Sequence, residues 1–220
     1  MKRIIIVVEG QTEQEFVSQI IEPYMRNKYG IYSVSAILIG TSNHRGGNIK
    51  FARLNSNLRI LTRQSNTVIS TFFDYFKLGK DFPKFEICQT QSNTEQKIEC
   101  LERELANAID HRFFIPYIQK YEFEALLFSS IEGYENYLNQ KSCNHIKETI
   151  QQFSNPEDIN NTMPPSYRLI EVFDLYENTK YNKVTLGNIL ALEIGIEKIL
   201  ERCPRFATWI NQLAAMATQA

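Results

Sequence analysis

The spacing of apolar residues predicts alternating strands and helices over the first half of the chain. Five consecutive β-branched residues, Ile4–Val8, suit a strand that is buried on both faces of a parallel sheet. Apolar residues then recur with a helical period and predict a helix over about 13–27. Further strands are predicted at 33–39, 68–73 and 113–117, and further helices at 49–64 and 94–111. This alternation predicts an α/β fold in which right-handed crossovers join the strands of a mostly parallel, four-stranded sheet.

The second half of the chain has a different composition and a helical pattern. Asn, Gln, Ser and Glu dominate residues 129–165. Helices are predicted at about 131–138, 143–153, 186–202 and 206–216, and residues 118–128 also have helical spacing. We therefore expect an α/β core over 1–128, with a helical insertion and a C-terminal helical segment over 129–220 that pack on this core.

The turn after the first strand carries a helix-start signal. Thr12 with Glu15 three residues later has the pattern of a capping box, in which a hydroxyl and a carboxylate satisfy the free N–H groups of a helix N-terminus. The first unit is therefore a strand, a tight turn and a helix.

Carboxylates follow three of the predicted strands. Glu9 and Glu13 come after the first strand, Asp74 after the third, and Glu122 with Glu124 after the fourth. Because the carboxyl ends of parallel strands meet at one edge of a sheet, we expect these acids to converge there. Acids that share a site repel one another, and Mg²⁺, with Mn²⁺ as a substitute, would relieve that repulsion. The alternative interpretation is that they are ordinary cap, turn or surface acids.

Overall charge and composition narrow the function classes. The net charge of −1 over 220 residues argues against coating of nucleic acid by bulk charge but leaves room for a local basic groove. No apolar run has the length of a membrane span and no signal-peptide pattern is present, so we expect a cytoplasmic protein. The four cysteines have no paired spacing and are expected to be reduced, and Cys143 with His145 lacks the second half of a zinc site.

Basic residues gather in a loop and on one predicted helix. The loop 40–48 holds His44 and Arg45 and is either a mobile segment that meets a phosphate or a plain connector. The helix over 49–64 carries Lys50, Arg53, Arg59 and Arg63. These four cations form either a solvated face or a nucleic-acid contact.

Five short motifs carry a resemblance to a known group of proteins. The Glu9-Gly10-x-Thr12-Glu13 pattern and the strand-terminal Asp74 resemble the Toprim domain of topoisomerases, bacterial primases and overcoming-lysogenization-defect-type nucleases. A closer resemblance is to an uncharacterised bacterial family of small Toprim-like proteins. The matching segments are 72–83, 116–128, 164–169, 181–183 and 203–213.

This resemblance implies a Toprim-like fold, a Mg²⁺ site and the residues that form it. The implied metal ligands are Glu9, Glu13, Asp74 and Glu124, with Glu122 beside the last. A basic residue near the C-terminus assists the chemistry of the nucleases, and Lys183 is the candidate, with Arg168 as the alternative. Either of these two could equally be a surface charge.

The sequence departs from the nuclease pattern at one position. Phe76 stands where the second aspartate of the Asp-x-Asp motif is expected. Two hypotheses follow. The first is a metal-dependent phosphodiesterase acting on DNA or RNA, and the resemblance adds an ABC-type ATPase partner and a role in phage defence. The second is a non-catalytic module with a degenerate metal site that binds nucleic acid or the ATPase.

A third class, the phosphotransfer receiver domain, also gathers acids at strand ends. It requires an acidic pair directly after the first strand, where this chain has the single Glu9. The sequence therefore disfavours a receiver domain.

Overall fold

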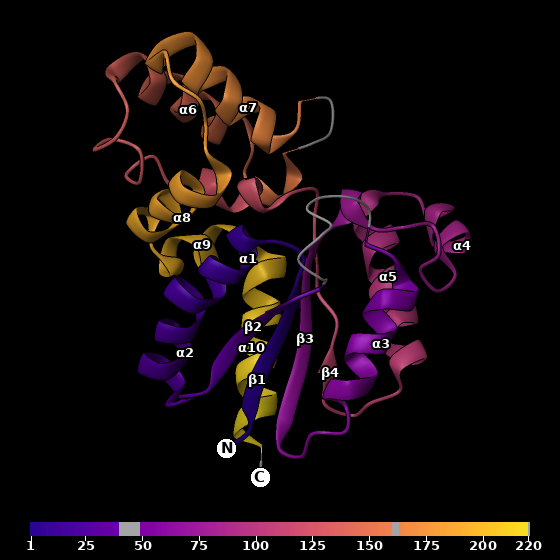
Figure 1. Cartoon of the computed structure of the whole chain (residues 1–220). Coiled ribbons are helices and arrows are strands. Elements are labelled where there is room, and N and C mark those ends of the chain that lie inside the picture. Colours follow the sequence, from indigo (N-terminus) through magenta and orange to yellow (C-terminus); the bar gives the residue numbers. More distant parts are fainter. Residues whose placement is uncertain (40–48, 160–162, 220) are drawn as a thin grey trace. The chain divides into compact units, whose positions relative to one another are not determined.

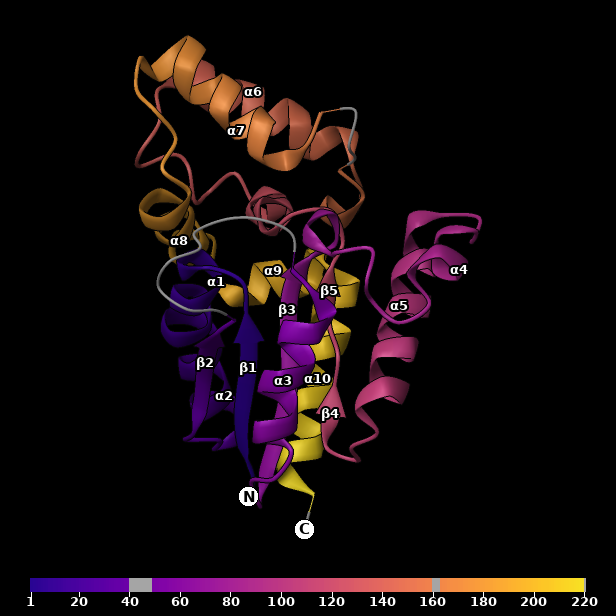
Figure 2. The ribbon, with the colours of Figure 1, turned by 45° about the vertical axis from the view of Figure 1, so that its right-hand side comes forward.

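A computed structural model describes residues 1–39, 49–159 and 163–219 of the chain (Figures 1 and 2). It divides into two compact units, which we call the sheet unit, Met1–Lys120 with Trp209–Ala220, and the helical unit, Tyr121–Thr208. The last helix therefore contributes to the sheet unit although more than eighty residues of the helical unit precede it in sequence.

In the part of the chain that the structure describes, the sheet unit has five strands, and all of their pairings are parallel. They are β1 (Arg3–Val8), β2 (Val34–Leu38), β3 (Thr67–Asp74), β4 (Phe114–Ile115) and β5 (Ile118–Gln119). Their order is β2-β1-β3-β4, and β5 pairs with β3 beyond the end of β4. The predicted α/β fold with a parallel sheet is thus confirmed.

The predicted fourth strand is divided in two, which gives five strands where four were expected. Pro116 and Tyr117 separate β4 from β5, and both short strands pair with β3. Proline has no N–H group to donate to a sheet, so the pairing is interrupted there. Thr71 in β3 holds the interruption together, because its hydroxyl accepts from Tyr117 N at 2.9 Å and donates to Tyr117 O at 3.0 Å.

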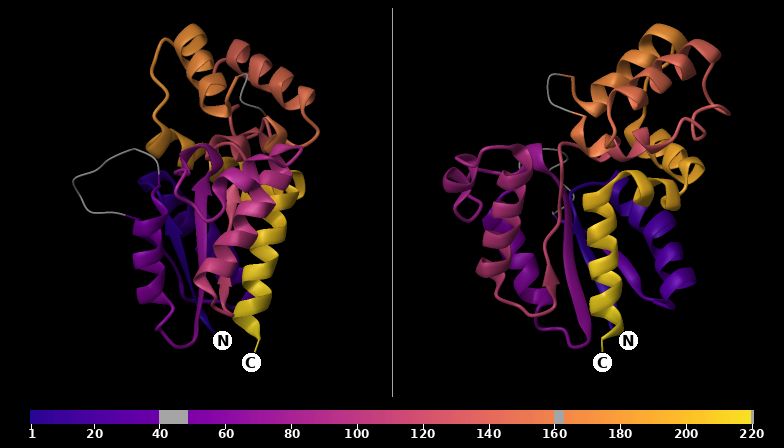
Figure 3. Two further views of the ribbon diagram at one scale, coloured as in Figure 1. Left: turned by 90° about the vertical axis from the view of Figure 1, so that its right-hand side faces the viewer. Right: turned by 180° about the vertical axis from the view of Figure 1, so that it is seen from behind.

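Helices cover both faces of this sheet, as the two views in Figure 3 show. The helical segments are α1 (Gln11–Phe16), η1 (Val17–Ile21), α2 (Glu22–Tyr29), α3 (Phe51–Leu61), η2 (Tyr75–Lys77), α4 (Phe85–Gln89), α5 (Thr94–Ile109) and the later part of α10 (Pro204–Thr218).

Alternating side chains of the strands fill the two cores. Phe73 of β3 packs with residues of α3, α4 and α5 on one face. Its neighbour Phe72 packs on the other face, with ring centroids 6.0 Å from Phe16 of α1 and 5.3 Å from Trp209 of α10. Every residue of β3 is buried, as the apolar sequence of this strand predicts for the centre of a parallel sheet.

The first helix begins earlier than predicted and has a different cap. Its N-cap is Gly10, and the Glu13 carboxylate accepts a hydrogen bond from Gly10 N at 3.1 Å. The predicted Thr12–Glu15 pairing is therefore wrong, because the chain turns into the helix directly after β1. A π-helical stretch, η1, then joins α1 to α2, and the helical run ends at Gly30.

The helical unit consists of short helices. They are η3 (Phe123–Ser129), α6 (Gln140–Gln152), η4 (Pro156–Asp158), α7 (Pro165–Val172), η5 (Phe173–Glu177), α8 (Lys183–Ile194), α9 (Ile196–Arg202) and the start of α10. The helix predicted at 131–138 is wrong, because these residues form turns. The helix predicted at 186–202 is two helices, which Gly195 separates with a φ of 79°.

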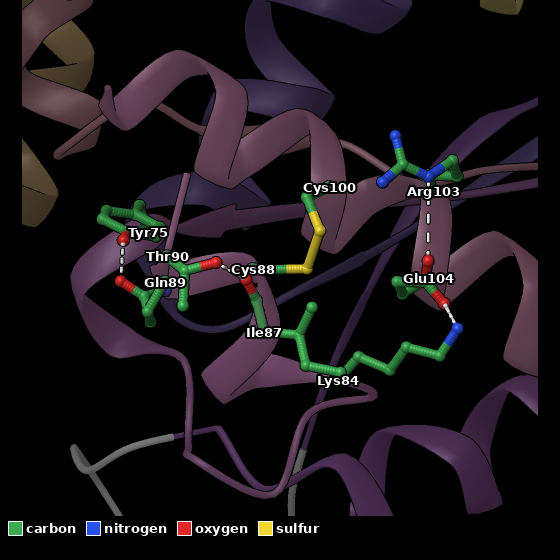
Figure 4. Close-up of a disulfide and its surroundings, with 9 residues drawn as sticks. All are labelled: Tyr75, Lys84, Ile87, Cys88, Gln89, Thr90, Cys100, Arg103 and Glu104. Atoms are coloured by element: carbon green, nitrogen blue, oxygen red, sulfur yellow. Dashed lines mark hydrogen bonds and ion pairs between the residues drawn. A yellow bond between two sulfur atoms is a disulfide. The ribbon is translucent and has the colours of Figure 1, made fainter. Parts of the chain in front are cut away.

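A disulfide joins two helices of the sheet unit and contradicts the expectation of four reduced thiols. It links Cys88 of α4 to Cys100 of α5, twelve residues apart, with 5.4 Å between their Cα atoms (Figure 4). The two cysteines come together because the consecutive helices α4 and α5 pack side by side, which the spacing of the cysteines does not reveal. Cys143 and Cys203 of the helical unit are free and buried. Among the described residues, no helix is long and apolar enough to cross a membrane.

Candidate active site

Two of the candidate acids end neighbouring strands of the sheet. Glu9 directly follows β1 and Asp74 is the last residue of β3. The two strands pair in parallel, with Val8 opposite Phe72, so both acids lie at the carboxyl edge of the sheet. Asp74 is buried and only 4% exposed, whereas Glu9 is half-buried. In open parallel sheets this edge is where ligands bind.

Glu13 lies on the first turn of α1, beside the same edge, and has a structural contact. Its carboxylate is buried and receives the hydrogen bond from Gly10 N described above. A Cβ atom at position 10 would lie 3.0 Å from Glu13 Oε2, so glycine leaves the room that the carboxylate occupies. The negative charge also suits the positive end of the helix dipole. Glu13 therefore fixes the turn between β1 and α1.

Carboxylate oxygens are the ligands that Mg²⁺ prefers, so the donor chemistry of this edge suits that ion. A stricter requirement is that at least three such side chains already lie close enough together to hold one ion. Within residues 1–39, 49–159 and 163–219, no three His, Cys, Asp or Glu side chains form a group that could hold a metal ion. The edge thus supplies suitable donors without presenting an assembled coordination shell.

The other candidate acids, Glu122 and Glu124, belong to the helical unit. Glu124 lies in η3 and is 1% exposed. Its Oε2 lies 3.2 Å from Nζ of Lys183, the first residue of α8, yet neither carboxylate oxygen accepts a hydrogen bond from the residues the structure describes. Burial raises the pKa of Glu124; the charge of Lys183 opposes this rise and that of Glu122 adds to it. A buried carboxylate in this state is costly to keep ionised.

Two buried tyrosines, which were not among the predicted site residues, interact electrostatically with Glu124. The Tyr181 hydroxyl is buried and has no hydrogen-bond partner among the described residues. Burial raises its pKa well above the ordinary value, and Glu124 adds to the rise. Burial and the charge of Glu124 also raise the pKa of Tyr134. Unlike Tyr181, Tyr134 has a hydrogen-bond partner, because its hydroxyl donates to Leu127 O at 2.9 Å. Tyr181 lies in a motif that carries the Toprim resemblance, whereas no sequence signal marks Tyr134.

Gly187 of α8 approaches this group closely. A Cβ atom there would lie 3.0 Å from the Tyr181 hydroxyl oxygen and 3.6 Å from Cε1 of Phe123. Glycine in a helix interior costs about 1 kcal/mol relative to alanine, and here the space beside Tyr181 explains its presence.

Glu122 and Arg168 both form hydrogen bonds with main-chain atoms of the helical unit. Glu122 Oε2 accepts a hydrogen bond from Ser166 N, at the start of α7, at 3.0 Å. Arg168 Nε donates to Met163 O at 3.1 Å, and its guanidinium lies 5.4 Å from the ring centre of Phe153. Of the two basic candidates, Lys183 is the one that pairs with Glu124.

A further buried acid, Glu157, was not predicted from the sequence. It is fully buried, and its two carboxylate oxygens accept hydrogen bonds from Arg205 N at 2.9 Å and Phe206 N at 3.2 Å. Both N–H groups belong to the first turn of α10. Glu157 is therefore a helix cap supplied from a distant part of the chain, which no local pattern reveals.

The basic residues predicted in the loop 40–48 and on the following helix lie in different surroundings. His44 and Arg45 of the loop 40–48 lie outside the described residues. On α3, Arg59 is exposed and donates to Asn55 Oδ1 at 3.2 Å, one helical turn away. Arg63 lies beyond the end of α3, in the turn that precedes β3.

Comparisons with known proteins give a family but no activity. A comparison with curated proteins finds none similar to this chain. Among solved structures, the chain is similar to the C-terminal region of the OLD protein of Xanthomonas campestris pv. campestris, with 13% sequence identity, a TM-score of 0.45, and coverage of 99% of this chain and 94% of that one. The family model described as "Domain of unknown function (DUF4276)" matches residues 8–214. This match spans nearly the whole sequence, and the chain therefore belongs to the DUF4276 family.

Proposed function

We propose that this protein is a Mg²⁺-dependent phosphodiesterase that cleaves DNA or RNA. The observation that carries the proposal is the placement of Glu9 and Asp74 at the carboxyl ends of two adjacent parallel strands. Asp74 is buried at this edge, where open parallel sheets bind their ligands. The resemblance of the surrounding motifs to Toprim nucleases supports the same reaction class.

Glu9 and Asp74 are the residues that would hold Mg²⁺. When bound, the ion would supply an activated water and stabilise the leaving oxygen of the phosphodiester. Glu13 keeps the turn that carries Glu9 in place through its bond to Gly10 N. We assign metal binding to Glu9 and Asp74 because both lie at the carboxyl ends of adjacent parallel strands, whereas Glu122 and Glu124 belong to the helical unit.

A role of Lys183 in the reaction rests on the Toprim resemblance. Its Nζ lies 3.2 Å from Oε2 of the buried Glu124, and this ion pair holds the ammonium group in place. Arg168 is the second choice, because its guanidinium is held by Met163 O and Phe153. An ABC-type ATPase partner and a role in phage defence rest on the Toprim resemblance alone.

The direct test is cleavage of supercoiled plasmid and of single-stranded RNA with Mg²⁺, Mn²⁺ or EDTA. We expect metal-dependent cleavage by the natural protein, and roughly a 1000-fold loss of rate in Glu9→Gln and Asp74→Asn, because a metal ligand contributes several kcal/mol to the transition state. Glu15→Gln is the matched control, since Glu15 is also a half-buried acid next to this turn. The proposal fails if both variants cleave as the natural protein does.

Glu13→Gln separates the two roles that Glu13 could have. A glutamine oxygen can still accept the hydrogen bond from Gly10 N but is a much weaker Mg²⁺ ligand. A Glu13→Gln variant that keeps its cleavage rate assigns Glu13 to the turn, and one that loses it assigns Glu13 to the metal.

A specific observation favours the second candidate function, a non-catalytic nucleic-acid- or ATPase-binding module. Phe76 occupies the place of an expected aspartate and is 41% exposed, and no ready metal-binding group is present among the described residues. This candidate predicts no cleavage with either metal and no heat of metal binding. The phosphodiesterase predicts both signals.

A further inference from the structure

A polar pocket lies at the amino ends of the strands, opposite the edge that holds Glu9 and Asp74. Its volume is about 700 Å³, within the range of small-molecule sites. All of its lining residues belong to the sheet unit. They come from the segments that lead into β1, β3 and β4 and from the end of α10, and include Lys2, Arg63, Asn66, His111, Arg112 and Phe113.

Two cations of this pocket share one aromatic ring. Lys2 Nζ lies 4.8 Å from the ring centre of Phe113, and the Arg112 guanidinium carbon lies 4.3 Å from the same centre. Both positive charges therefore lie next to the Phe113 ring. Lys2 is also only 8% exposed, and its ammonium donates a hydrogen bond to Gln219 O. A lysine so deeply buried is normally paired with an acid.

No acid of the described chain neutralises this group. Across the residues that the structure describes, neither Lys2, Arg63 nor Arg112 forms an ion pair with a carboxylate. His111 adds a buried ring nitrogen, Nδ1, that has no hydrogen-bond partner among those residues. Gathering like charges and an unsatisfied polar atom in one hollow costs free energy, and an anion bound there would offset that cost.

We infer that this pocket binds the phosphate group of a phosphorylated ligand. Arg63 and Arg112 are both exposed at the rim and can present the planar guanidinium fork that recognises phosphate oxygens in pairs. Lys2 supplies a fixed positive charge inside the pocket, and the Phe113 ring supplies an apolar wall. The phosphate belongs either to a free nucleotide-sized molecule or to a nucleic-acid strand. The site is separate from the proposed Mg²⁺ edge and does not depend on it.

Isothermal titration in the presence of EDTA tests this site without the metal. The three probes are inorganic phosphate, adenosine monophosphate and a single-stranded oligonucleotide. We expect saturable binding of at least one probe, weakened about tenfold or more by Arg63→Gln and by Arg112→Gln, because each removes a charge-assisted hydrogen bond. Both arginines are exposed, so these variants should fold normally, which their thermal unfolding will check.

Arg59→Gln is the matched control. It removes the same charge from an exposed position of α3 that does not line the pocket. Binding that survives Arg59→Gln and is lost in the two pocket variants supports the inference. Adenosine monophosphate bound as tightly as the oligonucleotide would identify a small ligand, and binding of the oligonucleotide alone would identify a nucleic-acid strand. The inference is overturned if no probe binds, or if Arg59→Gln weakens binding as much as the pocket variants do.

Discussion

In the sheet unit Cys88 and Cys100 are joined covalently, whereas in the helical unit Cys143 and Cys203 are free and buried. The disulfide ties α4 to α5, and Tyr75, the residue after Asp74, donates a hydrogen bond from its hydroxyl to Gln89 Oε1 of α4 at 2.8 Å (Figure 4). The covalent link therefore supports the segment that carries a candidate acid. The free thiols of the helical unit serve as apolar core residues.

The two units also differ in how they hold acids. In the sheet unit Glu9 and Asp74 stand at strand ends, where a ligand can bind. In the helical unit Glu124 and Glu157 are both buried, but only Glu157 has hydrogen-bond donors on both of its oxygens. Burial alone therefore does not identify a functional acid.

The largest expected effect on stability comes from breaking the covalent link. Replacing both linked cysteines by serine, Cys88→Ser with Cys100→Ser, should lower the free energy of unfolding by roughly 3 kcal/mol, because the disulfide restricts the unfolded chain. Urea unfolding measures this loss, and a reducing agent should not affect the double variant further. Thiol titration of the denatured, unreduced protein should find two thiols; four thiols would contradict the disulfide.

The next largest effect should come from Glu157. Glu157→Ala removes the carboxylate that accepts from two N–H groups of the first turn of α10, and should cost about 2 kcal/mol in the free energy of unfolding. Glu157→Gln keeps one acceptor oxygen and should lose less. If the alanine variant unfolds at the same urea concentration as the natural protein, Glu157 is not the cap described here.

A smaller effect tests the close approach of Gly187 to Tyr181. Gly187→Ala should be destabilising by about 1 kcal/mol, because the added methyl group presses on the tyrosine hydroxyl. In a Tyr181→Phe background, which lacks that hydroxyl, Gly187→Ala should instead be stabilising, since alanine is the better helix former. A double-mutant cycle measured by urea unfolding gives the coupling, and additive effects of the two changes would rule out the contact.

The smallest effect concerns pH. Because burial raises the pKa of Glu124, its contribution to stability is complete below its unfolded pKa, about 4.3, and is lost as the pH rises through the folded value. The stability of the natural protein relative to Glu124→Gln should therefore fall as pH increases from about 4. A relative stability that rises with pH would contradict the assignment.

The sequence predicts those parts of the molecule that depend on local patterns. The apolar run Ile4–Val8 correctly indicates a buried strand, and parallel pairing then places Glu9 and Asp74 at one edge. The N-cap of α5 is likewise local, because the Asn93 side chain accepts a hydrogen bond from Gln96 N, three residues later, at 2.9 Å.

Features made by distant segments could not be predicted in this way. The Cys88–Cys100 link requires knowledge of which helices pack together. The role of Glu157 depends on a helix that starts almost fifty residues later. The segment 131–138, predicted as a helix, forms turns instead, and the Tyr134 hydroxyl donates to Leu127 O, a contact that apolar spacing does not reveal.

Binding of Mn²⁺, followed by electron paramagnetic resonance, tests most directly the claim that the carboxyl edge of the sheet holds a metal ion. The natural protein and the Glu15→Gln control should both remove free Mn²⁺ from solution, and Glu9→Gln and Asp74→Asn should not. A natural protein that leaves all Mn²⁺ free, or Glu9→Gln and Asp74→Asn variants that bind it equally well, would contradict the account.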